Sequence, residues 1–519
     1  MSIRNARLVA FVTGFAVLAL ELTAFRIVAP FFGASIFITT NILAVVLGAL
    51  ALGYWYGGRR ADALGSTSAS TKQLSIVLVT AAVFTVGIAL LGPSLLAWGR
   101  GAVSGAEWSF IILSLLGIAV LFFIPTFLLA MVSPWLIRLT TQQVEKAGRR
   151  AGTLYAWSTI GSLLGTFLPT LVLIPFAGSK RTLLIIAAVI ALASAVVRAG
   201  KAGMASAATS VALLFFVTPQ FFAPAPNVLD ERETAHGYVR VVQNGRRTYL
   251  QQDEGYGIHS VYDPANILTG MNFDWFAIAP GLRKDDTDEL KVGVIGSAAG
   301  TAFMQYATLY GAESAQPRNL TLTGAEIDKE VVVLAKEYFA FDSIEPKPDV
   351  QIADGRTWLT ESDQQFDVLI VDAFKQLYIP SHLSTREFFE EAAEALAPGG
   401  VLVVNLNVVG EDSMVERRLS ATVADVFENT IAVDVPNSFN VIFYAGNHEF
   451  SLEGLPELVP PELNAVAKQV RRDARSISKS TNTRDISTDD RPLTESAFDA
   501  MVASAVFEGL TLDNGQVRE

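Results

Sequence analysis

The sequence contains no cysteine and only four histidines among its 519 residues. The absence of cysteine excludes disulfides, thiol catalysis and thiolate metal sites. The histidines are scattered, and no two of them have the spacing of a metal site. They are His236, His259, His382 and His448. We therefore predict that the protein uses no metal.

Acidic residues are scarce in residues 1–225, which hold only four of them against 15 lysines and arginines. The remaining residues hold 47 acidic side chains against 24 basic ones. Binding to phosphates requires clustered lysine and arginine, so we expect no nucleic acid partner for this acidic part. Its negative charge would steer a cationic substrate toward it, or would simply keep it soluble.

Long apolar runs fill the first part and predict a polytopic α-helical membrane domain. About 20 apolar residues are enough for a helix to cross the hydrocarbon core of a bilayer. The sequence has six such runs and a weaker seventh that ends in a proline-rich segment. They lie near residues 8–30, 38–57, 74–98, 109–136, 154–177, 182–197 and 204–222. We therefore predict a multi-pass protein of the cell membrane, with 6–7 transmembrane helices in contact with the lipid bilayer.

The positive charges between these runs predict their orientation, because cytoplasmic segments of membrane proteins are enriched in lysine and arginine. With the N-terminus inside, the cytoplasmic segments would carry 11 basic residues and the outer loops three. We therefore expect a cytoplasmic N-terminus. Six spans would leave the acidic part in the cytoplasm, as we predict, whereas a seventh span would place it outside.

Two charged residues, Glu21 and Arg26, lie within the first apolar run. Charged side chains within a membrane are costly and often mark functional sites. The two residues lie about 140° apart around a helix, so each needs a partner of its own. They are interpreted either as a structural polar clamp or as a ligand or transport site.

The acidic part begins with a predicted β-hairpin and continues as a predicted α/β domain. Two alternating runs flank Asn244-Gly245, which predicts a hairpin with a type I′ turn. From residue 285 to 455, short apolar strands alternate with amphipathic helices, which predicts a parallel Rossmann-like sheet. The predicted boundaries are 1–224, 225–284, 285–455 and 456–519. In the last segment, the polar residues 466–490 predict a mobile or loosely packed chain.

A glycine-containing loop and three acidic residues follow the predicted strands of this sheet. In such sheets the ligand lies outside the carboxyl ends of the strands, and small loop residues let it approach a helix N-terminus. The residues at these strand ends are Gly296, Ser297, Gly300, Glu326, Asp354, Gly355 and Asp372. Glu326 suits a ribose diol, Asp354 an adenine amino group, and Asp372 the reacting centre. The pattern therefore predicts an adenosine-type ligand.

Several segments have residues in the order of a known family's motifs. They are EIDKEVVVLAKEYF, ADGRTWL, FDVLIVDAF, IPSHLSTREFF, LAPGGVLVVNL and STDDRPL. They resemble the spermidine synthase, or polyamine aminopropyltransferase, family. The segments GFAVLALELTAFRIVAPFFG and LYAWSTIGSLLGTFLPTLVLIPFAG resemble the membrane domain of its membrane-fused bacterial members. The resemblance implies an S-adenosylmethionine methyltransferase-type Rossmann domain preceded by a small β-hairpin subdomain.

The resemblance also implies a transferase of polyamine biosynthesis. It would move an aminopropyl group from decarboxylated S-adenosylmethionine to a small-molecule amine, with Asp372 as the proton acceptor. Contacts to the nucleoside are implied for Glu326, Asp354, Gly355, His259 and Pro380, in addition to the loop of Gly296, Ser297 and Gly300. The candidates for substrate contact are Tyr262, Lys375, Tyr378 and His382. His382 is equally interpreted as a cap of the helix predicted at 385–397, and both roles stay open for it.

Three positions depart from the family's pattern and leave alternatives open. A histidine that the family has shortly before the first strand is replaced by Ile278 or a neighbour. The family has an aspartate in the glycine-rich loop where this chain has Ala299, and a second catalytic-loop aspartate where it has Lys375. Both acids would bind a cationic amine. The sequence is therefore also compatible with a methyltransferase or other transferase that uses intact S-adenosylmethionine. A third alternative is a non-catalytic, nucleoside-sensing or transport-coupled membrane protein. The acceptor and a homo-oligomeric state stay open.

Overall fold

The computed structural model divides the chain into two compact units. The first contains residues 1–225 and 233–238, and the second contains residues 226–232 and 239–519. The structure describes all residues except 33–35, 64–66, 102–106, 142–143, 199–200, 217–226, 253–256, 285–286, 374–378, 409–412, 494–496, 498–510, 514–515 and 519.

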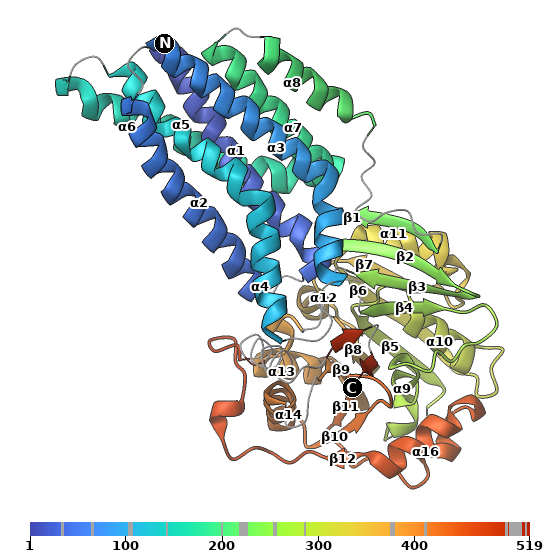
Figure 1. Cartoon of the computed structure of the whole chain (residues 1–519). Coiled ribbons are helices and arrows are strands. Elements are labelled where there is room, and N and C mark those ends of the chain that lie inside the picture. The colour runs from blue at the N-terminus through green and yellow to red at the C-terminus, as the bar shows by residue number, and fades with distance from the viewer. Residues whose placement is uncertain are drawn as a thin grey trace. The chain divides into compact units, whose positions relative to one another are not determined.

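The first unit is a bundle of long apolar helices (Figure 1). Its α-helices are α1 (Ile3–Phe32), α2 (Ile36–Ala63), α3 (Thr67–Gly101), α4 (Glu107–Ile118), α5 (Ile124–Thr140), α6 (Ala147–Leu168), α7 (Ile174–Val197) and α8 (Lys201–Leu213). Two π-helical turns, η1 (Ala119–Phe123) and η3 (Pro169–Leu173), join α4 to α5 and α6 to α7. Five helical segments of the described chain are long and apolar enough to cross a membrane.

The last of these five segments runs from Ala147 to Val197 and has 51 residues, more than twice what one crossing requires. It is interrupted at Gly178, whose φ of 78° and ψ of 161° are not helical. Glycine adopts this conformation because it has no Cβ. The interruption lies between the two apolar runs predicted at 154–177 and 182–197. By contrast, α8 has 13 residues, a length of about 20 Å, so the described helix of the predicted seventh run is too short to cross.

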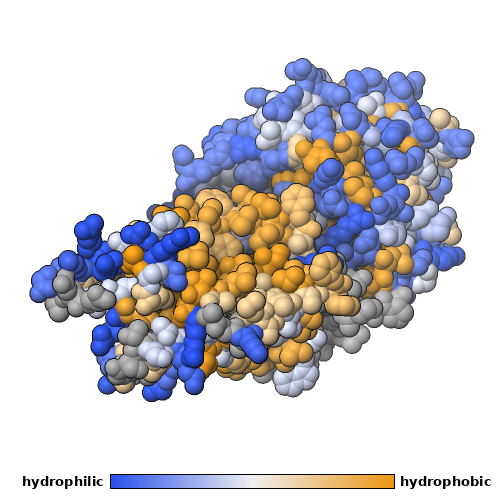
Figure 2. Space-filling model, turned by 90° about the horizontal axis from the view of Figure 1, so that it is seen from above, coloured by the Kyte–Doolittle hydropathy of each residue, from blue (hydrophilic) through white to orange (hydrophobic). Residues whose placement is uncertain are grey.

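Small residues let α1 and α6 approach each other closely. A Cβ added to Gly14 would lie 2.0 Å from the Ser158 carbonyl oxygen, and one added to Gly161 would lie 2.0 Å from that of Phe11. Close backbone contact of this kind is typical of helix pairs in membranes. Large apolar side chains such as Phe176 (86% exposed) face outward from the unit, as the orange surface in Figure 2 shows. The unit therefore has the surface of a membrane domain.

Four strands form a small sheet in the order β1-β2-β3-β4. They are β1 (Val228–Glu233), β2 (Tyr238–Asn244), β3 (Arg247–Gln252) and β4 (Ile258–Tyr262). The predicted hairpin is present, but the predicted turn is wrong by one residue. Asn244 pairs with Arg247, so the turn residues are Gly245 and Arg246, and of these only Gly245 has positive φ. A two-residue turn is type II′ when its first central residue is a glycine with positive φ and its second central residue has negative φ.

The second unit also contains an eight-stranded sheet in the order β12-β10-β11-β9-β8-β5-β6-β7 (Figure 1). Its strands are β5 (Glu289–Ile295), β6 (Asn319–Glu326), β7 (Asp349–Ile352), β8 (Phe366–Val371), β9 (Leu396–Asn407), β10 (Asn429–Asp434), β11 (Asn440–Gly446) and β12 (Arg475–Ser476). Strands β5 to β9 pair in parallel, and β11 pairs antiparallel with both β9 and β10. The predicted Rossmann-like α/β fold is confirmed.

The helices of this unit cover both faces of the sheet. They are α9 (Phe273–Phe276), α10 (Thr301–Tyr310), α11 (Lys329–Tyr338), α12 (Gly355–Glu361), α13 (Arg386–Ala395), α14 (Met414–Val426), α15 (Leu455–Leu458) and α16 (Asn464–Asp473). Phe303 and Tyr306 of α10 pack with Val368 on one face, while Phe388 of α13 packs with Leu369 on the other. Every residue of β8 is therefore buried, as parallel strands require.

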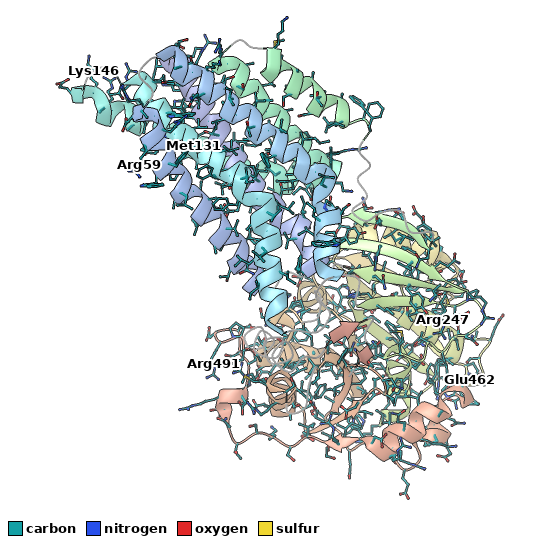
Figure 3. The ribbon with its side chains drawn as sticks, in the orientation of Figure 1. Arg59, Met131, Lys146, Arg247, Glu462 and Arg491 are labelled. Carbon is teal, nitrogen blue, oxygen red and sulfur yellow. The ribbon has the colours of Figure 1, made fainter. Side chains whose placement is uncertain are left out.

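The segment predicted as mobile, residues 466–490, is folded against the second unit. Val466 and Val470 of α16 lie in the apolar core. Ser487 is fully buried, and its carbonyl accepts a hydrogen bond from the Arg386 amide at 2.8 Å. Arg491, labelled in Figure 3, donates to the Thr483 carbonyl and closes this segment on itself. The prediction was wrong because a polar composition says nothing about bonds to distant parts of the chain.

One arginine connects this C-terminal segment to the helices of the sheet. The Arg356 guanidinium donates to both carboxylate oxygens of Asp489, at 2.8 and 2.9 Å. It also donates to both carboxylate oxygens of Glu391, at 2.8 and 2.7 Å. Paired bonds of this geometry are stronger than single ones.

Replacement of Asp489 should loosen the C-terminal segment without unfolding the sheet. In D489A, we expect faster proteolysis between residues 477 and 493 and a stability loss of about 1 kcal/mol, because the ion pair is partly exposed. The matched control is D473A, since Asp473 binds the adjacent surface residue Arg472. Limited proteolysis with mass spectrometry and thermal unfolding measure both effects. Equal cleavage in the two variants would contradict this role for Asp489.

Candidate functional site

The loops that follow β5 and β8 meet at the carboxyl edge of the sheet. Gly296 has a φ of 83°, and a Cβ added there would lie 2.6 Å from the Asp372 carbonyl oxygen. The Asp372 amide donates to the Ile295 carbonyl at 2.9 Å. This edge is where the strand order reverses, because β6 and β7 lie on one side of β5 and β8 lies on the other. Open α/β sheets bind their ligands at such a point.

The loop of residues 296–300 is held by hydrogen bonds from its own backbone. The amides of Gly296 and Ser297 donate to the Ala325 carbonyl at 3.0 and 3.1 Å. The Ala298 amide donates to the Glu326 carboxylate at 2.9 Å. The Ala299 amide donates to the hydroxyl of Ser260 on β4, also at 2.9 Å. The loop therefore has one fixed shape, set by its neighbours on both sides.

Gly300 ends this loop and begins α10. Its φ of 87° is left-handed, and a Cβ added there would lie 2.6 Å from the Phe341 ring. No side chain caps the N-terminus of α10. Ser297 is buried, and its hydroxyl has no hydrogen-bond partner among the described residues. The predicted Gly296, Ser297 and Gly300 thus belong to one rigid loop.

Glu326 ends β6 beside this loop and is 6% exposed. One carboxylate oxygen accepts from Ala298, and the other accepts from the Asp328 amide at 3.0 Å. Burial raises the pKa of Glu326 to about 7, although these backbone hydrogen bonds lower it. The Ile327 amide also lowers this pKa through a backbone hydrogen bond, and the carboxylate retains acceptor capacity for a ribose hydroxyl. Asp328 caps α11, since its side chain accepts from the Glu330 amide.

Asp354 caps α12 by accepting from the amides of Arg356 and Thr357, at 3.0 and 3.1 Å. Its other oxygen is 2.8 Å from Nε2 of His382. Burial favours the neutral acid, but the hydrogen bonds from Thr357 and His382 hold the pKa of Asp354 below its ordinary value. Gly355 follows it in close contact with Ile295, since an added Cβ would lie 2.2 Å from Cγ2 of that side chain.

The alternative role of His382 as a helix cap is wrong. Thr385 caps α13, since its hydroxyl accepts from the Phe388 amide. Pro380 begins the turn Ser381–Leu383 and places the exposed His382 beside Asp354. The loop after β8 therefore contacts the residues that follow β7. Of the substrate candidates in this loop, Lys375 and Tyr378 lie outside the described residues.

Asp372 follows β8, and its Oδ1 accepts a hydrogen bond from Nδ2 of Asn405 at 2.7 Å. Burial raises the pKa of Asp372 to about 7, although the bond from Asn405 lowers it. A carboxyl with such a pKa is suited to accept a proton near neutral pH. Asn405 was missed at the sequence level. The signal for it was a polar residue at the end of an otherwise apolar strand.

The predicted site residues His259 and Tyr262 lie on β4. This strand contacts the loop of residues 296–300 through Ser260. Burial lowers the pKa of His259 to about 4, so its imidazole is neutral at physiological pH. Tyr262 is partly exposed and packs against the core of the second unit. Both residues are therefore on the element that borders the loop.

Two isoleucines that sequence reasoning did not select are exposed at the same edge of the sheet. Ile327 follows Glu326 and is 46% exposed, and Ile352 ends β7 and is 49% exposed. Ile352 is the register partner of Glu326 in the parallel pair. Exposed apolar side chains beside a buried carboxylate suit a flat apolar ligand with a polar substituent.

The two charged residues of α1 have different surroundings within the first unit. The Arg26 guanidinium donates to the backbone carbonyls of Thr234 and Ala235, at 3.2 and 2.7 Å. Glu21 is partly buried in α1. The structure does not bring these two side chains to a common partner among the described residues. The arginine contact agrees with the structural interpretation of Arg26.

Comparisons with known proteins agree with this geometry. Residues 319–444 match the family model described as spermine/spermidine synthase domain. A probable polyamine aminopropyl transferase of Bifidobacterium longum is 35% identical over 235 residues, which cover 44% of this chain and 50% of the relative. A polyamine aminopropyltransferase of Vibrio vulnificus is 38% identical over 85 residues, which cover 15% of this chain and 27% of the relative. The chain thus spans half and about a quarter of the lengths of these two relatives.

The crystal structure of a probable spermidine synthase from Corynebacterium glutamicum aligns with 50% of this chain and 97% of that chain. The identity is 18% and the TM-score 0.37. We assign the fold from the strand order and the register, independently of this likeness. The predicted resemblance to the spermidine synthase family, a family of transferases, is confirmed by the family model and the relatives.

Replacement of Gly296 should disrupt the site because the loops after β5 and β8 leave no space for a side chain. In G296A, the added methyl would contact the backbone of Asp372 and Ala373 and would strain a left-handed residue. We expect a stability loss of about 1–3 kcal/mol and the loss of nucleoside binding. G454A is the control, since a Cβ there meets nothing within 4 Å. Thermal unfolding and methylthioadenosine binding test this, and equal behaviour of the two variants would contradict it.

Proposed function

Because residues 319–444 carry a spermine/spermidine synthase domain, we propose that the chain is a membrane-anchored aminopropyltransferase-type enzyme. It would transfer an aminopropyl group from decarboxylated S-adenosylmethionine to a small-molecule amine. The observation that carries the proposal is Asp372, a carboxyl with its pKa raised to about 7 at the reversal point of the sheet. A proton acceptor is required there, beside the loop that would hold the donor.

The residues at the sheet edge fit the nucleoside of such a donor. Glu326 retains acceptor capacity for a ribose hydroxyl beside the backbone amides that it binds. Ile327 and Ile352 offer apolar surface to the adenine ring. Gly296 lets the loop lie against the backbone of Asp372 and Ala373, beside the proposed donor site. Asp354 is an N-cap and a partner of His382, so its contact with the adenine amino group stays a prediction.

The chemistry assigned to the chain is the removal of one proton. The donor's sulfonium supplies an electrophilic carbon and a leaving group that departs as the thioether methylthioadenosine. The amine nitrogen forms a bond to that carbon as the carbon–sulfur bond breaks, and the electron pair of that bond goes to sulfur. Asp372 takes the proton that the nitrogen loses. Its raised pKa makes it a stronger base than an ordinary aspartate.

A second candidate function is the use of intact S-adenosylmethionine. The loop of residues 296–300 contains no acidic residue, and the side chain of Ala299 is buried in the apolar core. The loop therefore has no carboxylate that could bind a donor's amino group. An acid-free loop before the N-terminus of α10 instead favours a ligand with a carboxylate. The reaction would then be methyl or aminocarboxypropyl transfer.

The first unit supports membrane anchoring in this proposal. Its five long apolar helices would lie in the bilayer. The basic residues Arg59 and Lys146 lie toward the end of the bundle that holds the N-terminus (Figures 1 and 3). Since basic residues gather on the cytoplasmic side, we place this end in the cytoplasm.

Replacement of Asp372 tests its role as the base. In wild type, kcat/KM should fall as the pH decreases below about 7, because the carboxyl becomes protonated. We expect D372N to lose on the order of 10²- to 10⁴-fold in kcat. D434N is the control, as Asp434 is an exposed residue at the end of β10. Full activity of D372N with an amine acceptor would rule the mechanism out.

The same variant should change the pH dependence of stability. A carboxyl whose pKa is raised in the folded state stabilises the fold at low pH, and this contribution is lost as the pH rises through about 7. D372N should therefore lose less stability than wild type between pH 4 and about 8. Glu326 titrates in the same range, so part of the loss should remain in the variant. Thermal unfolding of the full chain in detergent measures this.

Calorimetric binding to the full chain in detergent separates the two donors. Tighter binding of decarboxylated than of intact S-adenosylmethionine is the expected result. The opposite order would favour the second candidate function, because the absence of an acid at Ala299 would then admit a carboxylate. Methylthioadenosine should bind in either case. Failure of all three ligands to bind would exclude both functions.

A further inference from the structure

A chain of amide groups leads away from the Asp372 carboxylate. Oδ1 of Asp372 accepts from Nδ2 of Asn405 at 2.7 Å. Oδ1 of Asn405 in turn accepts from Nδ2 of Asn440 at 2.9 Å. No described residue donates to Oδ2 of Asp372. Among the residues that the structure describes, one carboxylate oxygen is therefore bound by a side-chain amide.

The orientation of these amides is determined by the residues behind them. Nδ2 of Asn440 also donates to Oδ1 of Asn407 at 2.9 Å, and Oδ1 of Asn440 accepts from the Ser438 hydroxyl. Rotation of the Asn440 amide would place its oxygen against two other oxygens. Asn405 then keeps its own oxygen toward Asn440 and its NH₂ group toward Asp372. In this orientation the network presents a donor to the carboxylate.

The strand register explains why these residues meet. Asn440 pairs with Asn407 across the antiparallel strands β11 and β9. Asn405 and Asn407 are two residues apart on β9, so both lie on the face that carries the buried Val401 and Val403. This face is apolar along the strand and becomes polar only at the carboxyl end, next to Asp372. A polar network at that end needs a reason other than packing, because buried polar groups are costly unless they are paired.

We propose that Asn405 and Asn440 are positioning residues. Asn405 binds Oδ1 of Asp372 and Asn440 orients Asn405, which presents Oδ2 of Asp372 as the oxygen that accepts the amine's proton. This inference rests on the proposed role of Asp372 as the base. Asn405 acts on the carboxylate directly, and Asn440 acts through Asn405. Without the pair, the carboxylate would rotate between several orientations, and proton transfer depends on a fixed geometry.

The electrostatic surroundings of Asp372 make this effect measurable. Burial raises its pKa, the bond from Asn405 lowers it, and no charge on a described residue contributes. Lys375 lies outside the described residues. Loss of the amide bond should therefore raise the pKa of Asp372 further, while a purely structural role of the asparagines would leave it unchanged.

The test replaces Asn440, which does not touch Asp372. In N440A, we expect kcat to fall about tenfold, because the Asn405 amide loses the hydrogen bond that orients it and binds Asp372 less firmly. The apparent pKa in the kcat/KM profile should rise, while methylthioadenosine binding stays at the wild-type level. N440S is a second variant in case N440A folds poorly. N447A is the control, since Asn447 follows the other end of β11 and accepts from the Glu428 amide.

A second readout does not need activity. The difference in thermal stability between wild type and D372N, measured across pH, reports the titration of Asp372. We expect the difference between N440A and the double variant N440A/D372N to show this titration at a higher pH. An inactive D372N with an unchanged pH profile and unchanged titration in N440A and N440S would overturn the inference. A fully active D372N together with a displaced titration would instead overturn the proposed function and leave the amide network as described.

Discussion

The contact between the Gly296 backbone and the backbone of Asp372 determines the arrangement of the whole site. The two residues follow neighbouring parallel strands that leave the sheet where the strand order reverses. A Cβ at residue 296 would overlap with Asp372 and Ala373, so the loops can only meet this closely at a glycine. In the same loop, the Ala298 amide donates to the Glu326 carboxylate, and the Ala299 amide donates to the Ser260 hydroxyl. The loop, the carboxylate that ends β6 and the carboxylate that follows β8 therefore have fixed relative positions.

Burial gives the two carboxyls of this edge their chemistry. Glu326 ends β6 and Asp372 follows the fully buried β8, and desolvation raises the pKa of each to about 7. The groups that oppose this shift are neutral donors. They are backbone amides for Glu326 and the Asn405 amide for Asp372. A charged partner would have kept these acids ionised at low pH. The site is thus built from neutral hydrogen-bond donors around acids that titrate near neutrality.

Local patterns were enough to predict the elements and the acids at their ends. Strand alternation and the strand-terminal positions of Glu326 and Asp372 follow from residues that are close in the sequence, and the structure places both where they were expected. The turn after β2 was displaced by one residue because Asn244 pairs with Arg247, and this strand register does not follow from the dipeptide alone. The C-terminal segment was misjudged because its order comes from bonds between Arg356 and Asp489, which are 133 residues apart.

The sequence by itself determined the two-part organisation, the parallel sheet, the loop of residues 296–300 and the acidic residues around it. These features depend on hydrophobic periodicity and on the conformational freedom of glycine, which act over a few residues. Only the tertiary structure decided what each acid contacts. It paired Asp354 with His382 and Asp372 with Asn405, and it placed Asn440 behind Asn405. The physical reason is that these contacts depend on the antiparallel return of β11 beside β9, and no local pattern encodes that pairing.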